Sequence, residues 1–181
     1  MRILKKVSLK FSALFVRGPI SKLINFVSAS SFMKRNIKYL RRCGIIIVGT
    51  PNYISPDVYF DGHDYSKITL MDGCVLSKEV FLLTHDYSIA RGIEALHGKD
   101  WEKSKTPHFL KEIYVGENSF IGARTMLLPG THIGKNCIIG AGSVVKGTIP
   151  DNSIVVGNPA KVIAKTDEWA QKHMEKHDYL P

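Results

Sequence analysis

The sequence predicts an all-β solenoid of about four coils, and a six-residue repeat is the main reason. In this repeat the first place is aliphatic, the second is often Gly and the fifth is mostly small. From position 115 onward the repeat reads VGENSF, IGARTM, LLPGTH, IGKNCI, IGAGSV and VKGTIP. One short unit cannot bury its own apolar side, so the units must stack and form a core jointly. Three units per coil would give a triangular prism.

The same repeat can be followed upstream in two further groups. LMDGCV, LSKEVF and LLTHDY start at Leu70, Leu76 and Leu82, and VGTPNY, ISPDVY and FDGHDY start at Val48, Ile54 and Phe60. The period of six is shorter than the 8–12 residues that separate the strands of a β-sandwich. We expect the Gly that follows the aliphatic residue to supply backbone angles that a Cβ would penalise. Twelve units therefore form four groups of three.

Two interruptions divide the repeat. About four extra residues lie between Phe60 and Leu70, where two six-residue units would otherwise follow one another. The second interruption is a long polar loop, residues 86–112, after which the repeat resumes at Val115. A loop that protrudes from a regular scaffold usually helps to shape a binding or catalytic site.

Each end of the solenoid, residues 45–165, carries a segment of another kind. Residues 1–44 are basic and amphipathic, with apolar residues at helical spacing, so we expect helices there. Residues 166–181 predict a C-terminal helix with Thr166 as N-cap and acidic residues in its first turn. The N-terminal helices could cap the open end of the prism, or they could attach residues 1–42 to an anionic membrane surface.

The charge of +9 is concentrated at the N-terminus. Residues 1–42 contain eleven Lys or Arg and no acid, whereas the rest has fourteen basic and sixteen acidic residues, about −2. The basic segment lacks aromatic residues at base-stacking spacing, so no nucleic-acid partner is predicted. No apolar stretch reaches the roughly 18 residues of a membrane span. We expect a cytoplasmic protein, with attachment at the inner face of the membrane as the open alternative.

The repeats and the closing segment GAGSVVKGTIPDNSIVVGNPAKVI resemble the hexapeptide-repeat acyltransferases, over residues 48–165. THDYS before a long loop is similar to the branch that contains galactoside, maltose, antibiotic and polysaccharide acetyltransferases. The resemblance implies a left-handed parallel β-helix, although most crossovers between parallel strands are right-handed. It also implies a homotrimer, with acetyl-CoA lying in a groove between neighbouring prisms.

His85 is the candidate catalytic residue. It occupies the fourth place of LLTHDY, where the side chain should leave the core, at the start of the insertion. A neutral imidazole can accept a hydroxyl proton near pH 7, and the resemblance implies this role of general base in direct transfer. Asp86 could orient the imidazole or contact the substrate, although a backbone carbonyl is the nearer expectation for the second ring nitrogen. The sequence gives no other His that would lie beside His85 as a second metal ligand, so no metal site is predicted.

Four residues are candidates for acetyl-CoA. The resemblance places Ala123 and Ala141 along the pantetheine arm, where small side chains would let it lie against the coil. Lys146 and Lys161 could bind the phosphates as point charges. Relatives often carry Val-Thr-Lys where this chain reads Val-Val-Lys-Gly, which puts Lys146 one place early.

Besides Asp86, three residues are candidates for contacts with the acceptor. Asp57, and less strongly Asp61, could form hydrogen bonds with acceptor hydroxyls, and Trp101 in the insertion could stack on a sugar or on the cofactor. The resulting hypothesis is acetyl transfer to a sugar hydroxyl in bacterial surface polysaccharide synthesis. The alternatives are an N-acetyltransferase of an amino-sugar nucleotide, an antibiotic acetyltransferase, or a non-catalytic trimeric scaffold at the membrane surface.

Overall fold

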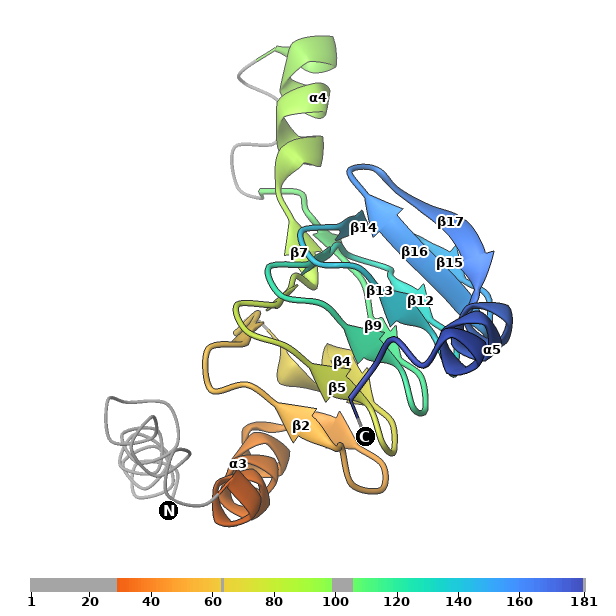
Figure 1. The fold of residues 1–181 in the computed structure, drawn as a ribbon. Coiled ribbons are helices and arrows are strands. Elements are labelled where there is room, and N and C mark those ends of the chain that lie inside the picture. The colour runs from red at the N-terminus through yellow and green to blue at the C-terminus, as the bar shows by residue number, and fades with distance from the viewer. Residues whose placement is uncertain (1–28, 63, 99–105, 181) are drawn as a thin grey trace.

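The computed structural model describes residues 29–62, 64–98 and 106–180, and these form a prism of stacked coils (Figure 1). Three parallel sheets make its faces. Sheet A contains β1 (Ile46–Ile47), β4 (Ile68–Leu70), β9 (Ile113–Val115), β12 (His132–Ile133) and β15 (Thr148–Ile149). Sheet B contains β2 (Tyr53–Ile54), β5 (Val75–Leu76), β10 (Phe120–Ile121), β13 (Ile138–Ile139) and β16 (Ser153–Gly157), and an antiparallel strand, β17 (Ala160–Lys165), closes it. Sheet C contains β3 (Tyr59–Phe60), β6 (Phe81–Leu82), β11 (Met126–Leu127) and β14 (Val144–Val145).

The aliphatic first place of the repeat forms the core, as predicted. Leu76, Ile121 and Ile139 stack in register in sheet B, and each is fully buried. Four complete coils are followed by a partial fifth, which agrees with the predicted number. The predicted start of the first unit is wrong by one residue, because Ile47 is the buried residue and Val48 is 47% exposed.

Gly is required at the second place of the repeat for a different reason from the predicted one. Gly122 does not have a positive φ; a Cβ there would lie 2.7 Å from the carbonyl oxygen of Ile139 in the next coil. The close approach of neighbouring coils therefore requires Gly at this place. The positive φ angles lie at the fourth place instead, for example at Asn118 and Arg124.

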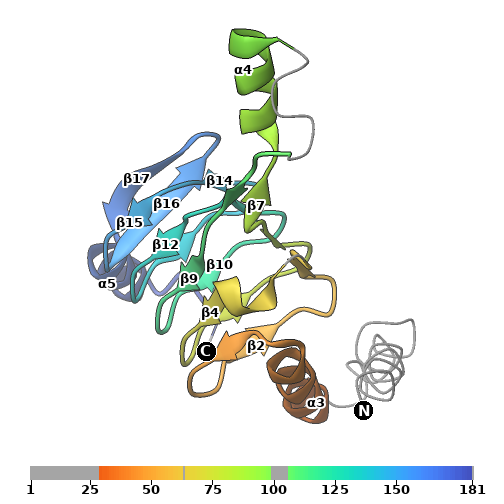
Figure 2. The ribbon, with the colours of Figure 1, turned by 180° about the vertical axis from the view of Figure 1, so that it is seen from behind.

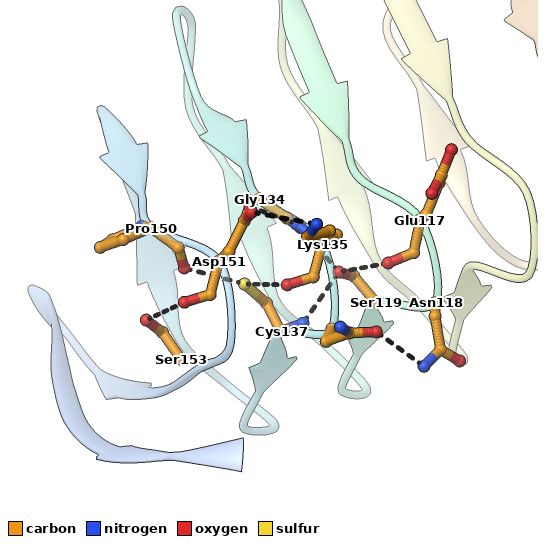
Figure 3. A network of polar contacts seen from close by, with 10 residues as sticks. Glu117, Asn118, Ser119, Gly134, Lys135, Cys137, Pro150, Asp151 and Ser153 are labelled. Atoms are coloured by element: carbon orange, nitrogen blue, oxygen red, sulfur yellow. Dashed lines mark hydrogen bonds and ion pairs between the residues drawn. The ribbon is translucent and has the colours of Figure 1, made fainter. Parts of the chain in front are cut away.

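The small fifth-place residues are buried and tie one coil to the next at the corners of the prism (Figure 3). Ser119 Oγ donates to the carbonyl of Gly134 at 2.8 Å and accepts from the backbone N–H of Cys137 at 3.0 Å. The Cys137 thiol in turn contacts the carbonyl of Pro150 at 3.2 Å. A side chain of this size both fills the corner and satisfies buried backbone groups of the neighbouring coil.

Helix α3 (Ala29–Cys43) lies against the first coil (Figures 1 and 2). Its buried face contains Phe32, Ile37 and Leu40, and Asn36 Nδ2 donates to the carbonyl of Ile54 at 3.2 Å. These contacts cover the end of the core. Residues 1–28, the rest of the segment predicted to be helical and membrane-binding, lie outside the described residues.

Helix α5 (Thr166–Lys176) follows β17, with Asp167 and Glu168 in its first turn as predicted. Thr166 is its first helical residue and Lys165 is the N-cap, so the prediction of Thr166 as N-cap is wrong. Among the helices of the described residues, none has the length and apolar character needed to cross a membrane.

The long insertion contains secondary structure that the sequence prediction missed. It comprises β7 (His85–Asp86), the helix α4 (Ser88–His97) and β8 (Phe109–Leu110), which pairs antiparallel with β7. The backbone N–H of Lys111 donates to the carbonyl of Thr84 at 2.8 Å, which holds the two ends of the insertion together. Helix α4 projects away from the prism (Figures 1 and 2). Trp101, a predicted acceptor contact, lies outside the described residues.

Candidate active site

His85 lies next to Asp61, a residue from the preceding coil. Phe60 and Leu82 pair in register in sheet C, so the residues that follow them leave the sheet at the same corner. Oδ2 of Asp61 contacts Nδ1 of His85 and accepts hydrogen bonds from the backbone N–H of His85 at 3.1 Å, the backbone N–H of Thr84 at 2.9 Å and Thr84 Oγ1 at 3.0 Å. One carboxylate therefore fixes the ring and the backbone of His85.

The hydrogen bonds around Asp61 keep it ionised. Its side chain is 2% exposed, and burial alone would raise its pKa. The hydrogen bonds from His85 and Thr84 outweigh this effect and hold the pKa of Asp61 below its usual value. An ionised carboxylate can only accept, so Nδ1 of His85 carries the proton and Nε2 is the basic nitrogen of the neutral ring.

This arrangement corrects two expectations for the imidazole. A carboxylate, and not a backbone carbonyl, contacts the second nitrogen, and that carboxylate is Asp61 and not Asp86. Asp86 Oδ1 accepts from the backbone N–H of Ser88 at 2.7 Å at the start of α4, and this hydrogen bond lowers the pKa of Asp86. The stacking of Phe60 under Leu82 is the sequence signal that could have identified Asp61.

Aromatic side chains of the insertion lie beside His85. The rings of His85 and Tyr87 meet edge to face with their centroids 5.3 Å apart, and Tyr87 lies 4.8 Å from the ring of His108. Tyr87 begins the outgoing arm of the insertion and His108 lies on the returning arm. Both arms therefore contribute to the surroundings of the base.

A pocket lies where the insertion meets the corner between sheets C and A. It is lined by Asp86, Phe109, Lys111, Leu128, Pro129 and Lys146. Lys146, a predicted phosphate ligand, thus lies at the same corner as His85. Its positive charge also lowers the pKa of Asp86. Lys111, which the sequence analysis missed, lies with Nζ 5.4 Å from the centroid of the Phe109 ring.

The remaining candidates lie on a different edge of the prism. Ala123 and Ala141 belong to the turns between sheets B and C, where the backbone N–H of Gly142 donates to the carbonyl of Ala123. Asp57 is on the same edge in the first coil, and Lys161 is exposed on β17 opposite Val156. One copy of the chain therefore does not bring these four residues to His85. Of the described residues, no three His, Cys, Asp or Glu side chains are grouped as a metal site would require.

Comparisons with known proteins agree with the repeat. Residues 112–147 match the family model described as bacterial transferase hexapeptide (six repeats). A Saccharomyces cerevisiae protein assigned as an acetyltransferase is 31% identical over 126 residues, which cover 66% of this chain and 59% of the relative. An Escherichia coli protein assigned as a lipopolysaccharide biosynthesis O-acetyl transferase is 28% identical over 99 residues, covering 55% and 50%. The chain thus spans little more than half the length of these relatives.

The fold is also that of a solved structure, a galactoside acetyltransferase in complex with coenzyme A. The alignment covers 98% of this chain and 86% of that chain, with a TM-score of 0.63 and 21% identity. At this identity the likeness concerns the fold alone, and it confirms the predicted left-handed parallel β-helix. The repeat and the prism agree with the family match: residues 112–147 carry the repeat of the bacterial transferase hexapeptide model.

Proposed function

We propose that this protein is an acetyl-CoA-dependent O-acetyltransferase that acts on a sugar hydroxyl, with His85 as its general base. The contact between the buried carboxylate of Asp61 and Nδ1 of His85 is the observation that carries the proposal. A histidine that only begins a loop has no need of a buried, ionised partner, because burying a charge is costly. A general base needs a fixed tautomer and orientation, and a carboxylate on the second nitrogen supplies both.

The chemistry then follows from the tautomer. Nε2 of His85 takes the proton of the acceptor hydroxyl. At the same time the hydroxyl oxygen forms a bond to the carbonyl carbon of the acetyl thioester. The carbon–sulfur bond breaks, and the proton passes from the imidazolium to the leaving thiolate of CoA. The charge of Asp61 stabilises the imidazolium between the two steps. No acyl-enzyme is needed, because a rigid prism can hold both substrates together.

We also propose that the site is completed by a second copy of the chain within a homotrimer. Ala123, Ala141 and Lys161 lie along one edge of the prism, while His85 and Lys146 lie at another corner. A groove between two neighbouring prisms would bring one copy's edge against the other copy's corner. Acetyl-CoA would lie there, with its pantetheine arm along Ala123 and Ala141 and its phosphates near the lysines.

The acceptor class is supported by the relatives. The solved structure is named a galactoside acetyltransferase, and the Escherichia coli relative is named for lipopolysaccharide biosynthesis. We propose a sugar hydroxyl of a surface polysaccharide or of its precursor. Asp57 and Asp86 are the carboxylates we assign to the acceptor. We place the reaction in the cytoplasm, where acetyl-CoA is available.

The test is release of CoA from acetyl-CoA with a panel of sugars, amino-sugar nucleotides and antibiotics. We expect a sugar hydroxyl to be acetylated, and His85→Asn to lower kcat by a factor of about 10²–10⁴. His132→Asn, an exposed histidine on sheet A, is the matched control and should keep full activity. Product that carries the acetyl group on an amine would favour the N-acetyltransferase. Binding of acetyl-CoA without turnover of any acceptor would favour the scaffold.

A further inference from the structure

The outer face of α3 carries a stripe of positive charge at one end of the prism. The stripe comprises Lys34, Arg35, Lys38, Arg41 and Arg42, and all five are exposed. Helix α3 has no acid, and the first carboxylate of the whole chain is Asp57. Within the part of the chain that the structure describes, none of the five forms an ion pair. The guanidinium of Arg41 donates to the backbone carbonyls of Ile47 and Gly49.

The apolar face of α3 is already occupied. Phe32, Met33, Ile37 and Leu40 pack on the first coil, each at most 9% exposed. The helix cannot insert this face into a bilayer without leaving the core of the prism uncovered. Any attachment through α3 must therefore use charge, and it must be sensitive to salt.

We propose that the cationic stripe of α3 docks the protein on the surface of an anionic phospholipid bilayer. The stripe is complementary in charge to such a surface, and α3 lies across the end of the prism, opposite β16 and β17 (Figures 1 and 2). Its exposed residues are Lys, Arg and Ser, with no exposed aromatic ring for stacking on nucleic-acid bases. Insertion β7–α4 points away from the α3 end (Figure 1), so docking would leave it accessible.

The experiment measures binding of the full chain to vesicles by flotation. The vesicles contain phosphatidylcholine with about one-third phosphatidylglycerol, and pure phosphatidylcholine vesicles serve as the neutral reference. The variant Lys34→Gln/Lys38→Gln/Arg42→Gln removes three cations from the stripe and leaves Arg41 in place. The control Lys165→Gln/Lys172→Gln/Lys176→Gln removes three exposed cations from the other end of the described chain, so the net charge changes equally.

We expect the α3 variant to lose binding by about fivefold per cation, or about 100-fold in total, and the control to bind like the wild type. Binding should also disappear near 1 M salt, where the Debye length falls to about 3 Å. Equal loss in both triple variants, or loss in neither, would overturn the proposal. So would binding that persists in high salt, which indicates insertion, or preferential binding to duplex DNA at equal phosphate concentration.

Thermal unfolding checks that the variants fold. If the triple α3 variant is destabilised, the single variant Lys34→Gln provides the same test with an expected loss of about fivefold. Vesicle binding is measured without substrate, so its result is independent of the acetyl transfer proposed above.

Discussion

Oδ2 of Asp61 contacts Nδ1 of His85 between two stacked coils. The same oxygen accepts hydrogen bonds from the backbone N–H and the hydroxyl of Thr84. Asp61 directly follows the strand β3, and His85 begins β7 three residues beyond the end of β6. The regular register of sheet C, which places Phe60 under Leu82, thus fixes a polar contact outside the core. A rigid solenoid positions the imidazole through backbone stacking, and the carboxylate selects its tautomer.

Asp61→Asn should lower kcat by a factor of about 10²–10⁴ while the KM for acetyl-CoA changes little. The amide cannot act as an ionised acceptor, so it no longer fixes the proton on Nδ1 or stabilises the imidazolium. Steady-state kinetics with the best acceptor measures both parameters. Asp151→Asn, an exposed aspartate at another corner, is the control for the same chemical change. Unchanged kcat in Asp61→Asn would remove Asp61 from the mechanism.

The low pKa of Asp61 also predicts sensitivity to acid. Its pKa is lower in the folded chain than in the unfolded chain, so the unfolded state binds the proton more readily. This contribution to stability is present above the unfolded value of about 3.9 and is lost as the pH falls through the folded value. Urea unfolding between about pH 3 and pH 6 should show a smaller decrease for Asp61→Asn than for the wild type. Asp86 and Asp167 titrate in both proteins, so the difference isolates Asp61.

The sequence predicted the stacked core because a period of six is an unambiguous pattern. An aliphatic residue at every first place, such as Leu76 or Ile121, can only be explained by inward stacking. The off-register start at Val48 shows the limit of the pattern, since two aliphatic neighbours compete for the inward place. The role of Gly122 was missed for another reason: the distance between coils does not appear in one unit read alone.

The candidate site was predictable only in part. His85 stood out because the repeat breaks there, and Lys146 falls at the same corner. Asp61 was predicted only as a weaker acceptor contact and Lys111 was not predicted, because they reach the site from the coils on either side, through the stacking register and the path of the insertion. Helix α4 was missed because it is only ten residues long and contains Gly92, a poor helix former.

Gly122→Ala and Gly92→Ala should change stability in opposite directions. A Cβ at Gly122 would overlap the backbone of the next coil, so we expect the free energy of unfolding to fall by about 1–3 kcal/mol. A Cβ at Gly92, inside α4, meets nothing within 4 Å and favours the helix by about 1 kcal/mol. Denaturant unfolding compares the two variants. A tolerated Gly122→Ala would contradict the close-approach explanation.

The three cysteines should differ strongly in reactivity. All are free thiols; burial raises the pKa of Cys74 to about 12 and also raises the pKa of Cys137, and both side chains are fully buried. Cys43, at the end of α3, is partly exposed. Mass spectrometry after brief maleimide treatment should find one label on the native chain, at Cys43, and three after denaturation. Labelling of Cys74 at the rate of Cys43 would show that the second coil opens readily.

Two inactive variants should restore activity to each other if the site is shared between copies. His85→Asn removes the base from the corner of sheets C and A, while Ala141→Trp blocks the exposed edge between sheets B and C. In a trimer of both variants, some sites combine an intact His85 from one copy with an intact Ala141 from its neighbour. Random assembly makes about a quarter of the sites intact.

Co-expression with two different affinity tags allows the mixed assembly to be purified and assayed for CoA release. Each variant alone should be inactive. The purified mixed trimers no longer contain the inactive homotrimers, so they should recover about a third of the wild-type kcat with a normal KM for acetyl-CoA. As the control, trimers of each variant are assembled separately and mixed just before the assay, and this mixture should stay inactive. If the mixed assembly is also inactive, although each variant folds and assembles, both residues serve the same copy. The corner of sheets C and A must then bind acetyl-CoA without a neighbour, with Lys111 and Lys146 as its only cations in the described pocket.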